Sequence, residues 1–380
     1  MRTITAPWAR IGLVALLCIC TAASAAESSA EIKLDENHSL ITPIQYKNLT
    51  VWQVAAQTVE KLDNVVPLQK AQEDKNIDIH EIAGGAEVNR LVIENKGKVA
   101  VLVLAGTIVK GGKQDRQIGQ DFVLNPGQTV NVDSFCVEHG RWTENRQTAD
   151  TQQRQEEPVQ QGRPTSAPNA ANVAPASVAT GGKFEAQTSM ASSSVRANGQ
   201  YKADQGAVWS KVAEENKANA VAPASGTFMA SKEKLATDED RKAIVALLKA
   251  KCEAPAGRNV VGLAYAVNGE IVNIRYFLAP NLYAGFAPAM IETIADDTVT
   301  RNAALGEEKV KAYAQQPKAL SGEEFKTFMY AERSKKETRD TPAANCNGYY
   351  ENKAAYSSET TGKEGALKDK VISADYTSKK

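Results

Sequence analysis

Residue types that usually carry metal or thiol chemistry are scarce in this sequence. It has five cysteines and three histidines among 380 residues, and it contains neither a C-x-x-C nor an H-E-x-x-H motif. Without either spacing, a structural zinc site or a zincin is not expected. The sequence therefore predicts no metal site, and the cofactor is unknown at this stage.

The sequence also lacks an apolar run long enough to cross a bilayer, which takes about 20 residues. Its N-terminal run, Ile11–Cys20, follows Arg2 and Arg10 and precedes the small residues 22–26. This order is typical of a cleavable secretory signal. We expect residues 1–26 to be removed and the protein to be exported, periplasmic or secreted, with no integral membrane span.

Charge of one sign is not in excess. Once Arg2 and Arg10 leave with the signal, 43 basic residues face 45 acidic ones. Proteins that bind nucleic acid usually present a basic surface. A nucleic-acid partner is therefore not expected, and the oligomeric state is unknown.

Three cysteines remain after removal of the signal, namely Cys136, Cys252 and Cys346. In an oxidising compartment two of them can pair and leave one over. Because Cys136 belongs to a motif described below, we expect Cys252 to pair with Cys346.

Strand patterns fill residues 44–145. The run Val99–Leu104 is apolar on both faces, which is typical of a central buried strand. Farther on, Asn125-Pro126-Gly127-Gln128 separates two short strand patterns and has the composition of a type II turn. Short strands at this spacing predict an antiparallel β-sandwich or an open sheet.

Helix patterns begin after a segment rich in Gln, Pro, Ala and Ser. We expect helices over Gln205–Lys217, from Thr237, and around Leu282–Ile294, where Pro288 suggests a late start. A further helix begins at Ser321 with Glu324, and Asn268-Gly269 predicts a β-hairpin with a type I′ turn. Trp52 and Trp209 are expected in the core.

The predicted fold class is α+β, with the strands first. The expected organisation is a signal peptide (1–26), a linker (27–43), a β-rich half (44–145), a flexible insertion (146–198) within which Phe184–Val195 can dock on the body, an α+β half (199–335) and a tail with possible edge strands (336–380).

Polar residues follow the buried strand where a loop is expected. They are Gly111, Gly112, Lys113, Gln114, Asp115 and Arg116. Paired glycines let backbone N–H groups approach an anion, and Lys113 and Arg116 add positive charge. The alternative is a glycine turn with a solvated ion pair between Asp115 and a basic neighbour. A phosphate-binding P-loop is excluded, because Thr107 stands where the first glycine belongs.

A second polar segment closes the β region and contains Cys136, Glu138, His139, Arg141 and Trp142. Cys136 or Glu138 could act in catalysis, and Arg141 could complete an anion clamp with Lys113. A nucleophilic cysteine needs a base that lowers its pKa, and only Glu138 or His139 is near in sequence. The alternative is a buried thiol that packs against Trp142.

These motifs resemble those of a known protein family. G-G-K-Q-D-R at 111–116, N-P-G-Q at 125–128 and F-C-V-E-H-G-R-W at 135–142 resemble the ARG-and-rhodanese-phosphatase-associated protein domain family, over residues 44–330 without the insertion. The family is uncharacterised, and its association with ADP-ribose-processing and phosphatase-like enzymes implies a nucleotide-derived or phosphorylated ligand. The resemblance places His139 at a variable position.

Three functions remain open. The first is a binding module for a small anionic ligand, lined by the glycine-lysine turn and by Glu138, Arg141 and Trp142. The second is a hydrolase-like enzyme that uses Cys136 or Glu138, with Lys113 or Arg141 stabilising charge. The third is a structural or envelope-interaction protein in which the insertion makes the contacts.

Overall fold

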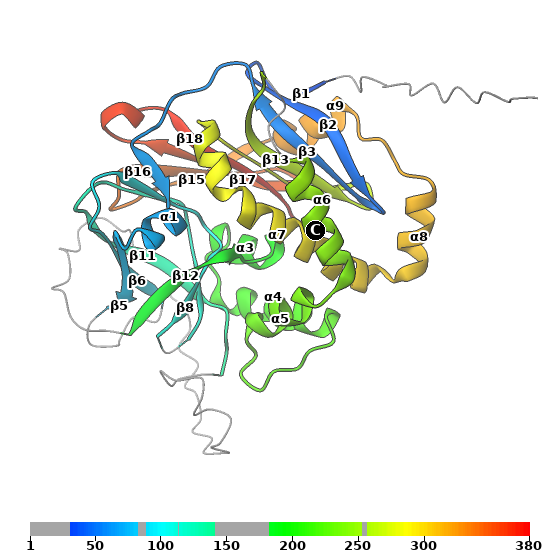
Figure 1. The fold of residues 1–380 in the computed structure, drawn as a ribbon, viewed down its shortest axis with the longest axis horizontal. Coiled ribbons are helices and arrows are strands. Elements are labelled where there is room, and N and C mark those ends of the chain that lie inside the picture. The colour runs from blue at the N-terminus through cyan, green and yellow to red at the C-terminus, as the bar shows by residue number, and fades with distance from the viewer. Residues whose placement is uncertain (1–30, 83–88, 113, 141–181, 253–256) are drawn as a thin grey trace, which may run out of the picture.

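The computed structural model describes residues 31–82, 89–112, 114–140, 182–252 and 257–380. The expected signal, most of the expected insertion, Lys113, Arg141 and Trp142 lie outside these residues. The described chain is α+β, as predicted. In Figure 1 a large sheet lies at the top, a barrel lies at the lower left, and the helices lie below and beside the sheet.

Nine strands form the large sheet, and every neighbouring pair in it is antiparallel. In sheet order they are β1 (Ile32–Lys33), β2 (His38–Tyr46), β3 (Leu49–Ala56), β13 (Asn259–Val267), β14 (Glu270–Phe277), β18 (Val371–Ser378), β17 (Ala355–Gly362), β16 (Asn345–Glu351) and β15 (Ser334–Asp340). The predicted hairpin is confirmed, because β13 and β14 are joined by Asn268 and Gly269 with φ values of 54° and 74°.

The tail contributes more than edge strands. It supplies most of β15 together with β16, β17 and β18, and β18 lies inside the sheet between β14 and β17. Ala374 and Tyr376 are buried on one face of β18, while Asp375 is buried on the other. Apolar and polar residues alternate in β18, and this pattern reveals neither how many neighbours the strand has nor that both of its faces are covered.

The barrel is closed by six strands, and a three-stranded sheet lies beside it. In barrel order these are β11 (Thr129–Cys136), β6 (Arg90–Asn95), β5 (Ile77–Glu81), β12 (Lys183–Met190), β8 (Thr107–Gly111) and β9 (Arg116–Ile118), and the small sheet holds β10 (Phe122–Leu124), β7 (Ala100–Val103) and β4 (Val65–Pro67). Every residue of β7 is buried, as the apolar run predicts. The expected docking of Phe184–Val195 takes the form of β12, whose Phe184 and Ala186 enter the barrel core.

Eight α-helices fall within the described residues. They are α1 (Leu68–Glu73), α3 (Ser193–Gln200), α4 (Gln205–Ala218), α5 (Phe228–Ala236), α6 (Glu239–Lys251), α7 (Pro280–Leu305), α8 (Glu307–Gln315) and α9 (Gly322–Tyr330), with a 3₁₀ turn at Gly365–Leu367. The helix over α4 and the capping box of Ser321 with Glu324 are confirmed.

Two helix starts differ from the prediction. Asp238 caps α6, because Thr237 ends the preceding helix α5. The long helix α7 starts at Pro280 and continues through Pro288, so the late start is wrong. Leu282 and Phe286 are buried in the core ahead of Pro288, and this packing offsets the backbone hydrogen bond that the proline removes.

Helices cover both faces of the large sheet. α6 and α7 pack on one face against Leu263 and Phe277, whereas α9 packs on the other face against Trp52. Trp52 is therefore buried, as predicted, but Trp209 is only partly buried.

The expected disulfide between Cys252 and Cys346 is not formed. Cys252 ends α6 inside the hydrophobic core, whereas Cys346 lies in β16, where its neighbours in the sheet are Asp340 and Thr361. The two thiols belong to separate layers, which the sequence could not reveal.

Candidate functional site

The two polar segments singled out in the sequence lie side by side. β9 pairs with β11 so that Arg116 stands opposite Cys136. Beyond the strands, the Val137 N–H donates to the Asp115 carbonyl at 2.9 Å, and the Gln114 amide donates to the Glu138 carbonyl at 2.9 Å. The barrel therefore brings together residues that are 20 to 24 positions apart in the chain.

The described residues of this motif cluster are largely buried. Arg116 forms an ion pair with Glu81 at 2.9 Å, and its guanidinium lies over the Phe184 ring. Asp115 and Glu138 are each 1 % exposed, and the Asp115 N–H donates to Glu138 Oε2 at 3.4 Å. The described residues of this cluster thus include the carboxyl groups of Glu81, Asp115 and Glu138 and the guanidinium of Arg116.

The paired glycines serve the packing of the barrel. Gly111 and Gly112 have φ values of 141° and 51°. A Cβ on Gly111 would lie 2.3 Å from the Lys183 carbonyl, and one on Gly112 would lie 2.4 Å from the Phe184 ring. The close approach of β12 thus requires glycine at both positions without reference to a ligand.

The Cys136 thiol is a poor nucleophile in these surroundings. Burial raises its pKa to about 11, although the nearby Arg116 guanidinium acts in the opposite direction. The thiolate is the reactive form of cysteine, and little of it exists at neutral pH with such a pKa. His139 is exposed and lies edge-on to Trp209, with ring centroids 4.5 Å apart.

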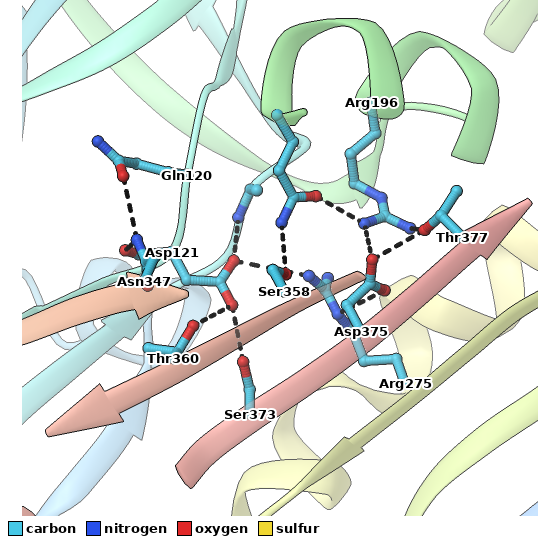
Figure 2. A network of polar contacts seen from close by, with 12 residues as sticks. Gln120, Asp121, Arg196, Arg275, Asn347, Ser358, Thr360, Ser373, Asp375 and Thr377 are labelled. Carbon is cyan, nitrogen blue, oxygen red and sulfur yellow. Dashed lines mark hydrogen bonds and ion pairs between the residues drawn. The ribbon is translucent and has the colours of Figure 1, made fainter. Parts of the chain in front are cut away.

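A second polar network lies between α3 and the large sheet (Figure 2). From α3, Arg196 donates to Asp375 Oδ2 at 2.7 Å and to Thr377 Oγ1 at 2.9 Å. Tyr201 also donates to Asp375, at 2.5 Å. Asp375 and Thr377 face the same side of β18 because alternate residues of a strand share a face.

Asp121 connects the barrel side of the molecule to the same sheet face. It follows β9 in the chain and accepts hydrogen bonds from Thr360 at 3.0 Å and Ser373 at 2.7 Å. It also accepts one from the Ala105 N–H at 2.8 Å. Asp121 is 2 % exposed, so this contact is a buried junction between the two halves.

Arg275 lies between the two carboxylates of this junction. Its Nε is 3.2 Å from Asp375 and its Nη2 is 3.5 Å from Asp121, and its side chain is 3 % exposed. Neither nitrogen has a hydrogen-bond acceptor of suitable geometry among the described residues. Burial acts to raise the pKa of Asp375, but Arg196 and Arg275 outweigh it and hold that pKa well below the usual range.

A cavity opens beside Arg275, between α3, the β13–β14 hairpin and α7. The centres of water molecules can occupy about 30 Å³ of it. Its polar side is formed by Ser193, Arg196, Tyr265, Asn273, Arg275 and Thr293, and its apolar side by Met190, Ala191, Leu263, Met290 and Ile294. The two charged side chains that line it are both arginines.

A family model described as the ARG and Rhodanese-Phosphatase-superfamily-associated Protein domain matches residues 37–377. The chain belongs to this family. The comparisons with curated proteins and with solved structures gave no match. The family domain therefore includes the tail strands β15 to β18, beyond the 44–330 that the motifs indicated.

Two buried carboxyl groups in the family domain lie just behind the cavity. Asp297 accepts from Tyr265 at 2.5 Å and from the Ser193 N–H at 3.1 Å. Glu215 accepts from Ser192 at 2.6 Å. Burial, and then the charge of Asp297, raise the pKa of Glu215 to about 7.

Sequence reasoning missed the polar junction of the family domain. Its central residues are Asp121, Arg196, Arg275 and Asp375. A signal was available, because Ser373, Asp375 and Thr377 alternate with apolar residues in a predicted strand. Such alternation normally marks a solvent-facing side, and α3 covers this side instead.

The described residues offer no group of three or more His, Cys, Asp or Glu side chains that could hold a metal ion. Within the same part of the chain, no helix is both long and apolar enough to span a membrane.

Proposed function

We propose that this protein is an exported binding protein for a small oxyanion, held in the cavity between α3, the β13–β14 hairpin and α7. The oxyanion is a carboxylate or a phosphate group. The sequence motifs suggested the same ligand class, but the supporting residues are now Arg196 and Arg275.

One observation carries the proposal, namely the two N–H groups of Arg275 that lack an acceptor. Asp121 and Asp375 balance the charge of the guanidinium, but their geometry leaves Nε and Nη2 without hydrogen bonds. A buried donor left in this state costs about 1–3 kcal/mol. An oxyanion in the cavity could accept from Arg275 once the guanidinium turns one of these buried N–H groups toward it, and Arg196 would add positive charge beside it.

The size of the cavity limits the ligand. One water needs roughly 10–15 Å³ of this kind of space, so the 30 Å³ present correspond to about two waters. Formate comes closest to this size, and acetate, whose methyl group adds an apolar part, or a lone phosphate would need a small movement of α3. Met290 and Ile294 would contact the apolar part.

Calorimetry and thermal unfolding with phosphate, formate and acetate test this proposal, with chloride as the salt control. We expect one of these anions to raise the Tm by several degrees, because ligand at 100 times its Kd stabilises a protein by about 2.7 kcal/mol. Arg275→Lys should weaken binding at least tenfold, since lysine keeps the charge but loses the planar fork.

Thr293→Leu provides a steric test, because it fills the cavity and leaves both arginines in place. Thr300→Leu is its control on the same helix, at a side chain that bonds Asn219 outside the cavity. Binding should be lost in the first variant and kept in the second. A cavity that holds only water would give no saturable anion effect in any of these proteins, and the proposal would then be wrong.

A further inference from the structure

A hollow of about 350 Å³ lies on the opposite side of the large sheet from the cavity. It is formed where β3 and β14 end and where β2 and β18 begin. His38, Ala56, Tyr276 and Val371 of these strands line it. Glu359 of β17 and Lys370, which precedes β18, line it as well. Its volume falls within the range of roughly 300–1,000 Å³ that is usual for small-molecule sites.

His38 is held in a fixed orientation at this hollow. Its Nδ1 donates to Asp35 Oδ2 at 2.9 Å, and Asp35 Oδ1 also accepts from the His38 N–H at 2.7 Å. Asn37 ties the turn to the end of β3, because its Oδ1 accepts from the Thr58 N–H at 2.9 Å. With Nδ1 occupied as a donor, Nε2 of the neutral ring is an acceptor.

An aromatic row extends from His38 beneath the hollow. The His38 and Tyr276 ring centroids are 4.2 Å apart, and Tyr276 stacks on Tyr376 at 6.3 Å. Tyr330 of α9 meets Tyr376 edge-on at 6.0 Å. These rings pack on one another, so the apolar floor is rigid.

Balanced charges surround this floor. Glu359 accepts from Arg333 at 2.7 Å, and Lys370 pairs with Glu60 at 2.9 Å. Arg333 in turn lies over the Tyr350 ring at 3.8 Å. The Glu359 and Lys370 side chains remain 26 % and 37 % exposed, so both can still contact a ligand.

We propose that this hollow is a binding site for a sugar ring. A pyranose has an apolar face and a rim of hydroxyl groups that both donate and accept hydrogen bonds. Val371, which is 39 % exposed, offers an apolar contact for the ring beside the edges of Tyr276 and Ala374, and His38, Glu359 and Lys370 fit the rim. Because Glu359 and Lys370 are already paired with Arg333 and Glu60, neither offers an unpaired charge to a charged ligand, whose burial would then be costly.

Saturation-transfer NMR on the full chain tests the proposal with glucose, galactose, N-acetylglucosamine, cellobiose, lactose and chitobiose. We expect at least one of these sugars to receive saturation at its ring protons. His38→Ala and Glu359→Gln should each weaken that sugar at least tenfold. His80→Ala, on the barrel strand β5, is the matched control and should bind as the unaltered chain does.

Both variants should keep the fold. In His38→Ala the backbone N–H still donates to Asp35, and in Glu359→Gln the amide oxygen can still accept from Arg333. Circular dichroism and the Tm check this directly. The proposal is overturned if no sugar receives saturation, if the folded His38→Ala protein binds as well as the control, or if free tyrosine and phenylalanine bind in place of the sugars.

Discussion

The Cys136 thiol ends β11 at 2 % exposure, and its burial raises its pKa to about 11. A reactive cysteine would instead be accessible and have a lowered pKa. The structure thus favours a packing role for this thiol and weakens its use in a hydrolase.

Iodoacetamide labelling measures this difference. In the native protein at pH 8 we expect Cys136 to remain unlabelled while the partly exposed Cys346 reacts, with both modified after denaturation. Peptide mass spectrometry gives the extent at each site. Labelling of native Cys136 below pH 8 would restore the thiol hydrolase as a candidate.

Glu215 should make stability depend on pH. Its pKa is raised from the usual 4.5 to about 7 by burial and by Asp297. A carboxyl group with a raised pKa in the folded state binds its proton more tightly there than in the unfolded chain. Its stabilising contribution is therefore complete below about pH 4.5 and is lost as the pH rises through about 7.

The measurement compares the free energy of unfolding of the unaltered chain with that of Glu215→Gln between pH 4 and 8. The glutamine does not titrate, so the unaltered chain should lose stability relative to it over this range, on the order of 3 kcal/mol in total. A difference that does not change with pH would contradict the raised pKa.

At the scale of elements, the approach of β12 to β8 explains the glycine pair. Gly112 and Gly127 both have positive φ, at 51° and 71°, but only the Gly112 position would place a Cβ against another group. A substitution at Gly127 therefore tests the effect of backbone strain alone, whereas a substitution at Gly112 adds a steric clash.

Alanine at each position is the test. Gly127→Ala should cost about 1 kcal/mol from the left-handed backbone alone. Gly112→Ala should cost at least about 2 kcal/mol, because the same strain is joined by a clash with the Phe184 ring. Denaturant unfolding gives the free energy of unfolding of both variants. An equal decrease in the two would show that the Phe184 ring moves aside at no cost.

The local signals of several elements were sufficient to predict them. Asn268-Gly269 can take two positive φ values, and Ser321 with Glu324 supplies the hydrogen bonds of a capping box, so both features follow from a few adjacent residues. Pro288 was misleading because the core contacts of Leu282 and Phe286 decide where α7 begins.

At the scale of the whole molecule, the export proposal concerns residues 1–26. The charged, apolar and small segments in that order should be read by the export machinery and a signal peptidase. Expression of the full chain in a bacterium should yield a periplasmic or secreted protein whose N-terminus lies close to Glu27. Intact-mass measurement of the fractionated protein checks this.

The double variant Arg2→Glu and Arg10→Glu is a useful companion. It reverses the charge of the segment before the apolar run and leaves that run intact. Processing should slow markedly. A full-length protein that remains in the cytoplasm in both cases would show that the segment is not a signal.

The sequence by itself determined the α+β class, the hairpin, the capping box at Ser321 and the family motifs. These depend on backbone preferences and on patterns within short stretches, which act before distant residues meet.

Only the tertiary structure decided where charge is buried and where space remains. Arg275 of β14, Arg196 of α3 and Asp121 after β9 meet because the barrel side and α3 pack on one face of the large sheet, which the tail strands complete. Contacts between elements so far apart in the chain cannot be predicted from a local pattern. Each of these residues looks like an ordinary solvent-facing polar side chain until another element covers it.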